Sequence, residues 1–488
     1  MFRSFIASLL LLMSQLTWAQ SLKINVHLDT SAHQPLTGRL YIFSVTDTTM
    51  GVQDPDPFHP SPTFYLDVKN WKGGEIRTLD STAPAYPVKL SNLTPGFYKF
   101  AAILDIDTVE RNNTTTTGNW YSRDVVAKVI PGDNGEVHLY LRRQIPKNVF
   151  RESDSIKEVV MKSKLLSAFH RQDIFIKAGI VLPAGYKQNT GITYPVVFII
   201  PGWGGTHTDA TGRGPAQRYG FGMGKEKIYV YLNPETQTRW GLHSFVDSRV
   251  NGPWGKSLVE EFIPYLATQY RINPDPATHF LVGQSSGGYG TLWLQLNYPK
   301  AFNGCWSVSP DPVDFSNFTS VNIYEKNVNM YYDSKGNVRP FFIVNGQPSA
   351  TIKEFGEFEY FLGDGGQLQA FEAEFGLPDK NGRPLMLFDR KTGAIDPRIA
   401  KTWQPYDMGL FVLNNYKRLE KDLSGKVHVF AGADDNFFLN GAVLLFKTKA
   451  EKANAVLTAE LIPGANHWSI WSTAFTQRVQ KEIDERVR

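Results

Sequence analysis

Residues 281–290 read LVGQSSGGYG, with two adjacent serines between glycines where an apolar run ends and a helix-like run begins. A strand, a sharp turn and a helix carrying G-x-S-x-G form a nucleophile elbow, in which small flanking residues let the backbone bend and expose one hydroxyl. Only Ser285 has glycine both two positions before it, Gly283, and two positions after it, Gly287. The spacing therefore predicts Ser285 as the nucleophile. Ser286 is expected to give its backbone N–H to an oxyanion.

A serine hydroxyl is a weak nucleophile and needs a base, which an acid must orient. On a strand-elbow-helix scaffold these partners follow in the order serine, acid, histidine. The stretch VHVFAGADDNFFL puts Asp434 and Asp435 just after an apolar run, and LIPGANHWSI puts His467 in a loop further on. His207 and His243 compete as the base, but both precede the serine. The order predicts His467 as the base and one of the two aspartates as the acid.

A second oxyanion donor should come from a loop that follows an early strand. The stretch FIIPGWGGTH has this form, with Trp203 as the expected donor. Glycines at 202, 204 and 205 let the backbone approach a substrate closely. The alternative interpretation of the same residues is a plain tight turn.

Residues 239–255, RWGLHSFVDSRVNGPWG, are dense in Trp, His, Asp and Asn and are expected to form a pocket wall. Each of these residues alone is more often structural than in contact with a ligand. The candidates for substrate contacts, including two from the glycine-rich loop and the elbow, are Gly204, Gln284, His243, Asp247 and Trp254.

Composition argues against several other classes of function. The net charge is +4 over 488 residues without a basic cluster, which disfavours nucleic acid and anionic membranes as partners. No P-loop or dinucleotide fingerprint occurs. His207 and His243 lack the close spacing of a zinc motif, and Cys305 is the one cysteine. We therefore expect neither a metal nor a cofactor, and an ordinary buried thiol at Cys305.

The first residues have the pattern of an export signal. Residues 1–19 combine a basic start at Arg3, an apolar centre and a small-x-small exit at Thr17 to Ala19, as in a secretory signal peptide. The apolar centre is too short to cross a bilayer, and no later stretch reaches the roughly 20 apolar residues of a membrane helix. We expect a secreted or periplasmic protein.

The remaining chain changes rhythm near Pro146. Residues 21–145 alternate apolar and polar positions between Pro, Gly, Asn and Asp turns, which predicts a small Ig-like β-sandwich. Residues 150–488 contain short runs that are apolar on both faces, separated by helix-like stretches. This alternation predicts an α/β fold with a mainly parallel sheet. Residues 311–425 interrupt it with an aromatic, Gly-rich insertion, expected to be a lid or subdomain.

The chain resembles the putative esterase (esterase D-like) family of α/β-hydrolases, which includes feruloyl, acetylxylan and enterochelin esterases. The matching pieces are IVLPAGY, IIPGWGG, GPWGKSLVEEFIPYL, GQSSGG, GADDNFFL and PGANHW. The resemblance implies that the acid is the fourth residue of a G-x-x-D turn, which is Asp435. The sequence departs from the family at Gln284 and Ser286, where members often have histidine and methionine, and at Pro201, where many have histidine. Residues 21–145 lie outside the resemblance.

Together these patterns predict a secreted serine carboxylic-ester hydrolase that acts through an acyl-enzyme. Ser285 would attack, His467 would move the proton and Asp435 would orient the imidazole, with the N–H groups of Ser286 and Trp203 binding the oxyanion. The substrate would be a small-molecule or glycan ester, such as an acylated glycan or a siderophore ester. There are two alternatives: an acyltransferase that uses the same residues, and a catalytically silent polysaccharide-binding protein.

Overall fold

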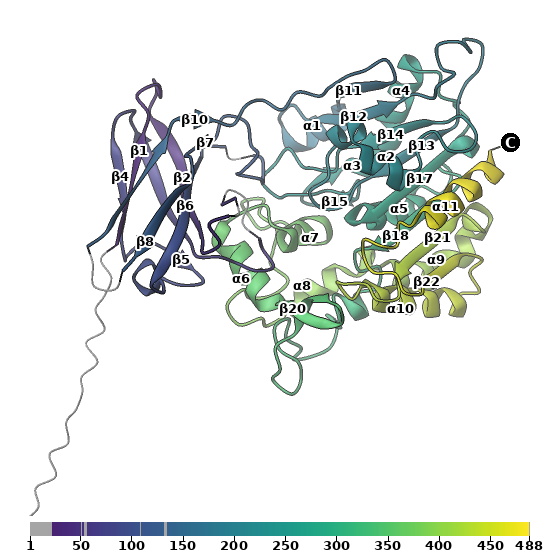
Figure 1. Ribbon diagram of the computed structural model, residues 1–488. Coiled ribbons are helices and arrows are strands. Elements are labelled where there is room, and N and C mark those ends of the chain that lie inside the picture. Colours follow the sequence, from purple (N-terminus) through teal and green to yellow (C-terminus); the bar gives the residue numbers. More distant parts are fainter. Residues whose placement is uncertain (1–21, 50, 53–55, 108, 131–133, 488) are drawn as a thin grey trace, which may run out of the picture. The chain divides into compact units, whose positions relative to one another are not determined.

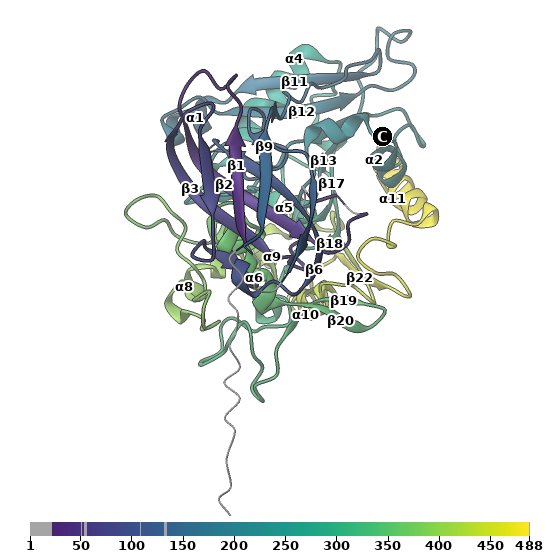
Figure 2. The ribbon, with the colours of Figure 1, turned by 60° about the vertical axis from the view of Figure 1, so that its left-hand side comes forward.

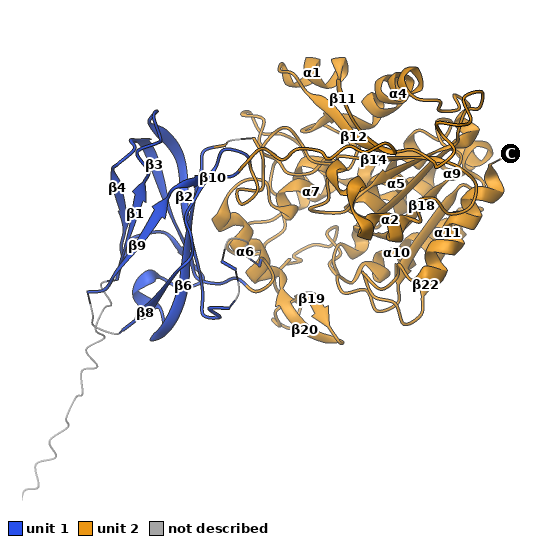
Figure 3. Cartoon of the chain, turned by 45° about the horizontal axis from the view of Figure 1, so that its top comes forward, with its two compact units in different colours: residues 1–56, 60–106, 117–145 blue, residues 57–59, 107–116, 146–488 orange. Residues whose placement is uncertain are grey.

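The computed structural model describes residues 22–49, 51, 52, 56–107, 109–130 and 134–487. They form two compact units, shown in different colours in Figure 3. Of the described residues, unit 1 contains those within 1–56, 60–106 and 117–145, and unit 2 contains those within 57–59, 107–116 and 146–488. The predicted signal peptide, residues 1–19, lies outside the described residues.

Unit 1 consists of two β-sheets, and its strands have the alternating burial that the sequence predicts. In β9, for example, Val137, Leu139 and Leu141 are buried and the residues between them are exposed. The smaller sheet has the order β4-β1-β9, with β1 parallel to β9 (Figure 2). The larger has the order β10-β7-β6-β2-β3-β5, with β8 also paired to β6. The strands are β1 (Lys23–Leu28), β2 (Leu36–Val45), β3 (Thr63–Trp71), β4 (Ile76–Leu79), β5 (Ala85–Tyr86), β6 (Gly96–Asp105), β7 (Trp120–Tyr121), β8 (Val125–Val129), β9 (Glu136–Leu141) and β10 (Arg143–Gln144).

Unit 2 is built on an eight-stranded sheet of order β11-β12-β14-β13-β17-β18-β21-β22. The pairs β11 with β12 and β12 with β14 are antiparallel, and the six strands from β14 to β22 run parallel. The strands are β11 (Ile156–Lys162), β12 (Phe175–Val181), β13 (Val196–Ile200), β14 (Ile228–Leu232), β17 (His279–Ser285), β18 (Cys305–Pro310), β21 (Val427–Gly432) and β22 (Thr458–Ile462). The structure confirms the predicted α/β fold with a β-rich region before it.

Helices cover both faces of this sheet (Figure 1), and alternate residues of one strand enter two different cores. Val196, Phe198 and Ile200 of β13 pack in one core with side chains of α5, α9 and α10. Val197 and Ile199 pack in the other with side chains of α2 and α11. This explains why the strands are apolar at every position. The helices are α1 (Lys164–His170), α2 (Arg213–Tyr219), α3 (Trp254–Ser257), α4 (Ile263–Gln269), α5 (Ser286–Asn297), α9 (Met408–Leu423), α10 (Leu439–Lys452) and α11 (Thr473–Arg486).

A long segment separates β18 from β21. It contains β19 (Pro340–Val344), β20 (Gln347–Thr351), α6 (Ile352–Leu362), α7 (Gln367–Phe375), α8 (Pro397–Thr402) and α9. Helix α9 contacts α5 and α10 and is the crossover that two parallel strands require. The predicted insertion, residues 311–425, thus includes one helix that belongs to the basic sheet architecture. No helix within the described ranges is long and apolar enough to span a membrane.

The order of strands reverses between β13 and β17. From β13 the chain adds β14 on one side and later β17 on the other. In open α/β sheets the crevice beyond the carboxyl ends of the strands at such a switch point is where ligands bind. The loop after β13 carries Trp203, and the end of β17 is Ser285. The topology therefore positions the two segments that the sequence singles out side by side.

Candidate active site

Ser285 occupies a strained turn between β17 and α5. Its backbone has φ 58° and ψ −127°, a conformation that a residue with a side chain rarely adopts. A Cβ at Gly283 would lie 2.3 Å from the carbonyl oxygen of Gly287, and a Cβ at Gly287 would lie 1.9 Å from that of Ile200. Both glycines are therefore sterically required. Strain of this kind concentrates at functional sites and is held by the surrounding structure.

Asp435 and His467 meet beyond the end of β21. The Nδ1 atom of His467 lies 3.0 Å from Oδ2 of Asp435, and the two residues are 5% and 1% exposed. The other carboxylate oxygen, Oδ1, accepts the backbone N–H of Phe437 at 2.9 Å. Asp435 thus holds the imidazole and also satisfies backbone donors of the turn. Asp434 is exposed, so geometry favours Asp435 as the histidine's partner.

The loop of His467 is fixed on both sides by side-chain amides. Gln284 donates from Nε2 to the carbonyl oxygen of His467 at 2.6 Å, and the backbone N–H of His467 donates to Oδ1 of Asn436 at 3.2 Å. The edges of Phe437 and Trp468 contact the imidazole, with ring centroids 4.9 and 5.4 Å away. Gln284, predicted to contact substrate, lines the pocket, but its amide donor is used to position the histidine loop.

The hydroxyl of Ser285 is directed to an acid that sequence reasoning missed. Its Oγ donates to Oδ1 of Asp311 at 3.2 Å, and Oγ of Ser286 donates to Oδ2 of the same carboxylate at 2.5 Å. Among the described residues no hydrogen bond joins Ser285 to His467. Burial raises the pKa of Asp311 to about 6, although the hydroxyl donors and the nearby His467 oppose this shift. Asp311 directly follows β18, the parallel neighbour of β17. In the sequence, the one sign of this acid was a polar residue just after the strand-like run CWSVSP.

The loop after β13 passes next to the nucleophile. A Cβ at Gly202 would lie 3.0 Å from Cβ of Ser285, so the backbone approaches as closely as the sequence predicts. Trp203 lines the same pocket as Ser285. Ser286 is the first residue of α5, where backbone N–H groups have no partner within the helix. Both backbones are therefore positioned where oxyanion donors could act.

Trp203 is held by a residue from the N-terminal part of the chain. The guanidinium of Arg111 lies 4.1 Å from the centroid of its indole ring, and Arg111 forms a bidentate ion pair with Glu235, with Nη2 to Oε1 at 2.6 Å and Nε to Oε2 at 2.8 Å. Residues 107–116 belong to unit 2. Nothing in the local sequence indicates this, since the segment reads as a polar loop between strands.

The pocket at Ser285 has a volume of about 380 Å³ and a wall that is aromatic in part. Phe58 stands inside an aromatic cluster, with ring centroids 5.5 Å from Phe355 and 5.8 Å from Phe437. Charged and phenolic groups, Asp209, Arg218 and Tyr231, form another part of the wall. The remaining lining residues are Pro201, Gly202, Trp203, Gly205, Gly214, Pro215, Gln284, Ser285, Asp311, Pro312, Thr319, Phe341, Gln367, Phe371, Leu439, His467 and Trp468.

Four other predicted substrate contacts do not line this pocket. His243 stacks on Trp254 with ring centroids 3.4 Å apart, and the two residues are 0% and 2% exposed. Asp247 accepts hydrogen bonds from the Tyr298 hydroxyl and from the backbone N–H of Lys256. The expected pocket wall, residues 239–255, is instead a mostly buried support. Its Ser244 carbonyl lies against α5, where a Cβ at Gly290 would be 1.9 Å from that oxygen.

Burial shifts the pKa of two of these support residues. The pKa of His243 is lowered well below its usual value, chiefly by burial, so the ring is neutral. Burial raises the pKa of Asp247. Gly204, the remaining predicted contact, is exposed and has φ +84°, as a tight turn requires. The composition of residues 239–255 thus reflects packing.

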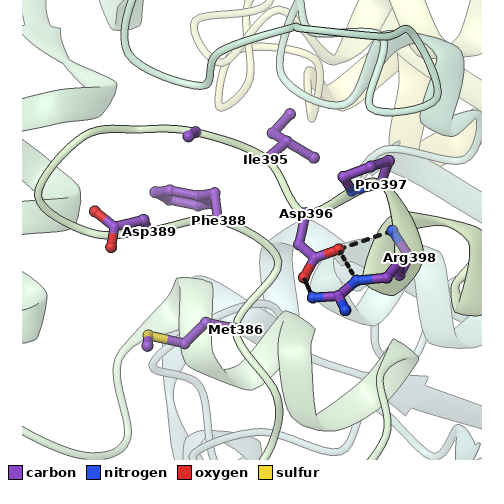
Figure 4. Close-up of a pocket in the computed structure, with 8 residues that line it drawn as sticks. Met386, Phe388, Asp389, Ile395, Asp396, Pro397 and Arg398 are labelled. Carbon is purple, nitrogen blue, oxygen red and sulfur yellow. Dashed lines mark hydrogen bonds and ion pairs between the residues drawn. The ribbon is translucent and has the colours of Figure 1, made fainter.

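A second cavity, of about 500 Å³, lies in the segment between α7 and α8. Figure 4 shows that two of its three charged residues, Asp396 and Arg398, bond to each other. It contains none of the predicted site residues. No group of three or more His, Cys, Asp or Glu residues suited to a metal occurs within the described part of the chain.

An elbow serine at the switch point of a mainly parallel sheet, beside an aspartate-histidine pair at a following strand end, defines the α/β-hydrolase class. The family model for putative esterases matches residues 173–481, more than half of the 488 residues. The chain therefore belongs to this esterase family and is a carboxylic ester hydrolase. A search of curated proteins gave no match.

Several solved structures resemble the chain over about two thirds of its length. A ferulic acid esterase is 14% identical, with a TM-score of 0.42, and the match covers 68% of this chain and 98% of that one. An S-formylglutathione hydrolase from Agrobacterium tumefaciens is 17% identical, with a TM-score of 0.41, and the match covers 68% of this chain and 95% of that one. A ferulic acid esterase from Anaeromyces mucronatus is 14% identical, with a TM-score of 0.33, and the match covers 69% of this chain and 94% of that one. The family assignment rests on the match to residues 173–481.

Proposed function

We propose that this protein hydrolyses its ester by a Ser285-His467-Asp435 triad through an acyl-enzyme. The observation that carries the proposal is the 3.0 Å contact of Asp435 with His467, which lines the same pocket as the strained, partly buried Ser285. This is the arrangement in which an acid fixes the tautomer and orientation of a base.

In the proposed reaction, Oγ of Ser285 attacks the ester carbonyl carbon and its proton passes to Nε2 of His467. Asp435, bound to Nδ1, stabilises the imidazolium that forms. Backbone N–H groups of Ser286 and Trp203 bind the oxyanion. The tetrahedral intermediate then expels the alcohol, which takes the proton from the imidazolium, and water attacks the acyl-serine by the same route in reverse.

This reaction requires Ser285 to change its hydrogen-bond acceptor. Its hydroxyl donates to Asp311 in the free protein, and catalytic hydrogen bonds often form only when substrate is bound. Rotation of one serine side chain is a small motion on a fast timescale. We therefore assign the contact with Asp311 to the resting enzyme.

The pocket wall supports an ester with an apolar or aromatic part. Phe341, Phe371, Phe437 and Trp468 line it together with Phe58, and flat rings pack against such side chains in offset or edge arrangements. We propose an acylated glycan or a siderophore ester as the natural substrate, encountered after export directed by residues 1–19.

Two measurements test the proposed triad. The first is turnover of a p-nitrophenyl acyl ester, where Ser285→Ala should lower kcat by roughly 10⁴- to 10⁶-fold. Ser286→Ala should cost far less, because its hydroxyl donates to Asp311 and only its backbone N–H is assigned to the reaction. The second is covalent labelling by a fluorophosphonate, located by peptide mass. Labelling at another residue, or an active Ser285→Ala variant, would refute the assignment.

A further inference from the structure

Asp311 is a buried carboxylate that the nucleophile itself helps to satisfy. It is 4% exposed. Its backbone N–H donates to the carbonyl oxygen of Ser285 at 3.1 Å, and its carboxylate oxygens accept one hydroxyl each, Oδ1 from Ser285 and Oδ2 from Ser286. No Lys or Arg of the described chain forms an ion pair with it. A buried carboxylate of this kind is costly to maintain unless its oxygens are hydrogen-bonded.

The proposed reaction removes one of these two donors. When Ser285 turns to His467, Oδ1 of Asp311 loses its hydrogen bond while Oδ2 keeps Ser286. Two other polar side chains of the pocket already donate elsewhere: Gln284 to the carbonyl of His467 at 2.6 Å, and Thr319 to the carbonyl of Phe318 at 2.8 Å. A buried acceptor left unpaired carries the full cost of its desolvation.

We propose that Asp311 is a specificity-determining residue, which holds the nucleophile at rest and then accepts a hydrogen bond from a hydroxyl or ammonium group of the substrate. The inference rests on the proposed triad. Because Oδ1 lies 3.2 Å from Oγ of Ser285, the substrate donor must lie within one or two bonds of the scissile ester. The substrate class is thus an ester with a hydroxyl or amino group close to the ester bond. In the acyl part, this group is on the carbon next to the carbonyl. In the alcohol part, it is on the carbon next to the one bonded to the ester oxygen.

The test compares matched esters with and without that donor. On the acyl side the pair is p-nitrophenyl mandelate and p-nitrophenyl phenylacetate. On the alcohol side it is 2-hydroxyethyl benzoate and ethyl benzoate. For each pair the ratio of kcat/KM, hydroxylated over plain, is measured in the wild type and in Asp311→Asn. Dividing the two ratios removes the intrinsic difference in reactivity between the esters.

We expect the wild-type ratio to exceed the Asp311→Asn ratio by about tenfold for one of the two pairs, as for a hydrogen bond to a charged acceptor. The pair that responds shows which side of the ester carries the donor. The control is Glu374→Gln, since Glu374 is also buried, at 1% exposure, and does not line the pocket. That variant should keep the wild-type ratios.

A measurement on the wild type covers the case in which Asp311→Asn does not fold. Protonation makes the carboxyl a weaker acceptor, so the preference for the hydroxylated ester should shrink as the pH falls below about 6. The titratable groups around Asp311 are His467, Asp435 and, from α7, Glu374. Both esters of a pair depend equally on the protonation of His467, and its effect cancels in the ratio.

Equal ratios in the wild type and Asp311→Asn for both pairs, or a wild-type preference that does not change with pH, would overturn the role of Asp311 while leaving the triad intact. Absence of turnover of all four esters together with absence of fluorophosphonate labelling would instead refute the triad, and this inference with it.

Discussion

Two stretches of unit 2 contain the same residue types but differ in burial and in position relative to the sheet. Each has a histidine, an aspartate and a tryptophan, which are His243, Asp247 and Trp254 in the first and Asp435, His467 and Trp468 in the second. In the first stretch the rings stack on each other and Trp254 is 2% exposed, whereas Trp468 is 50% exposed. The second stretch follows the carboxyl ends of parallel strands, where side chains converge on the crevice. Position relative to the sheet, more than composition, separates a site from a support.

The largest contrast is expected between the two histidines. His467→Ala should lower kcat for a small acyl ester by roughly 10⁴- to 10⁶-fold, because a triad acts as a unit, and should cost about 1 to 3 kcal/mol of stability, because it leaves the buried Asp435 without its partner. His243→Ala should lower stability by about 2 to 4 kcal/mol, since it opens a cavity beside Trp254, but should leave the kcat of the folded enzyme nearly unchanged. Chemical denaturation and steady-state kinetics on both variants measure the two effects. A His243→Ala protein of normal stability that lost turnover would return His243 to the site.

The two aspartates after β21 provide a narrower comparison. Asp435→Asn should lower kcat by roughly 10⁴-fold, because loss of the acid leaves the histidine in the wrong tautomer. This fold-change is the one known for the same substitution in a serine protease. Asp435→Asn should also cost about 1 kcal/mol of stability or less, because Asn can still accept the N–H of Phe437. Asp434→Asn should change neither quantity, since Asp434 is exposed. A slow Asp434→Asn enzyme beside a fast Asp435→Asn enzyme would move the acid one residue back.

The sequence predicts the elbow well because its requirements are local. Gly283 and Gly287 are needed by steric contacts around one turn, and the spacing of such glycines is visible in the chain. The positions of Asp435 and His467 follow from strand order, which repeats across the fold class. Asp311 was missed because its role depends on which strand lies beside β17. His243 was misassigned because exposure of a loop residue depends on how the loop packs against α5.

Asp311, the acid that sequence analysis missed, should make the stability of the protein depend on pH. The folded-state pKa of Asp311 is raised from 3.8 to about 6, so the fold favours its protonated form. The associated stability is fully present below pH 3.8 and is lost as the pH rises through about 6. Two pKa units correspond to about 3 kcal/mol at most. Asp311→Asn should therefore gain stability relative to the wild type between pH 4 and pH 7.

Urea denaturation of the wild type and Asp311→Asn across this range measures that difference. Glu374→Gln is not a control here, because burial also raises the pKa of Glu374 and its removal should act in the same direction. Asp434→Asn is the suitable control, and its stability difference from the wild type should not change with pH. A constant difference for Asp311→Asn as well would mean that Asp311 is ionised throughout the range.

The smallest expected effect concerns the boundary between the two units. The sequence divides the chain near Pro146 and assigns all chemistry to the C-terminal side of that proline, and on that basis residues 150–488 alone should cleave a small ester. Phe58 and Arg111 precede that boundary, yet both belong to unit 2, in the aromatic cluster and against Trp203. We therefore expect a fragment that starts at residue 146 to be slower than the full chain, with part of the loss due to Arg111 alone.

Arg111→Ala isolates that part. A guanidinium over an indole is worth about 0.5 to 2 kcal/mol, so kcat should fall by roughly 2- to 30-fold if Trp203 supplies an oxyanion donor, while KM should change little. Arg239→Ala is the matched control, since Arg239 also lies over a tryptophan, 5.9 Å from the Trp240 ring centroid, and pairs with a carboxylate, Asp364. Neither Arg239 nor Trp240 lines the pocket, so that variant should keep its kcat. An equal loss in both variants would show that Arg111 acts only through general stability. An unchanged Arg111→Ala enzyme would show that the contact of Arg111 does not position Trp203 for catalysis.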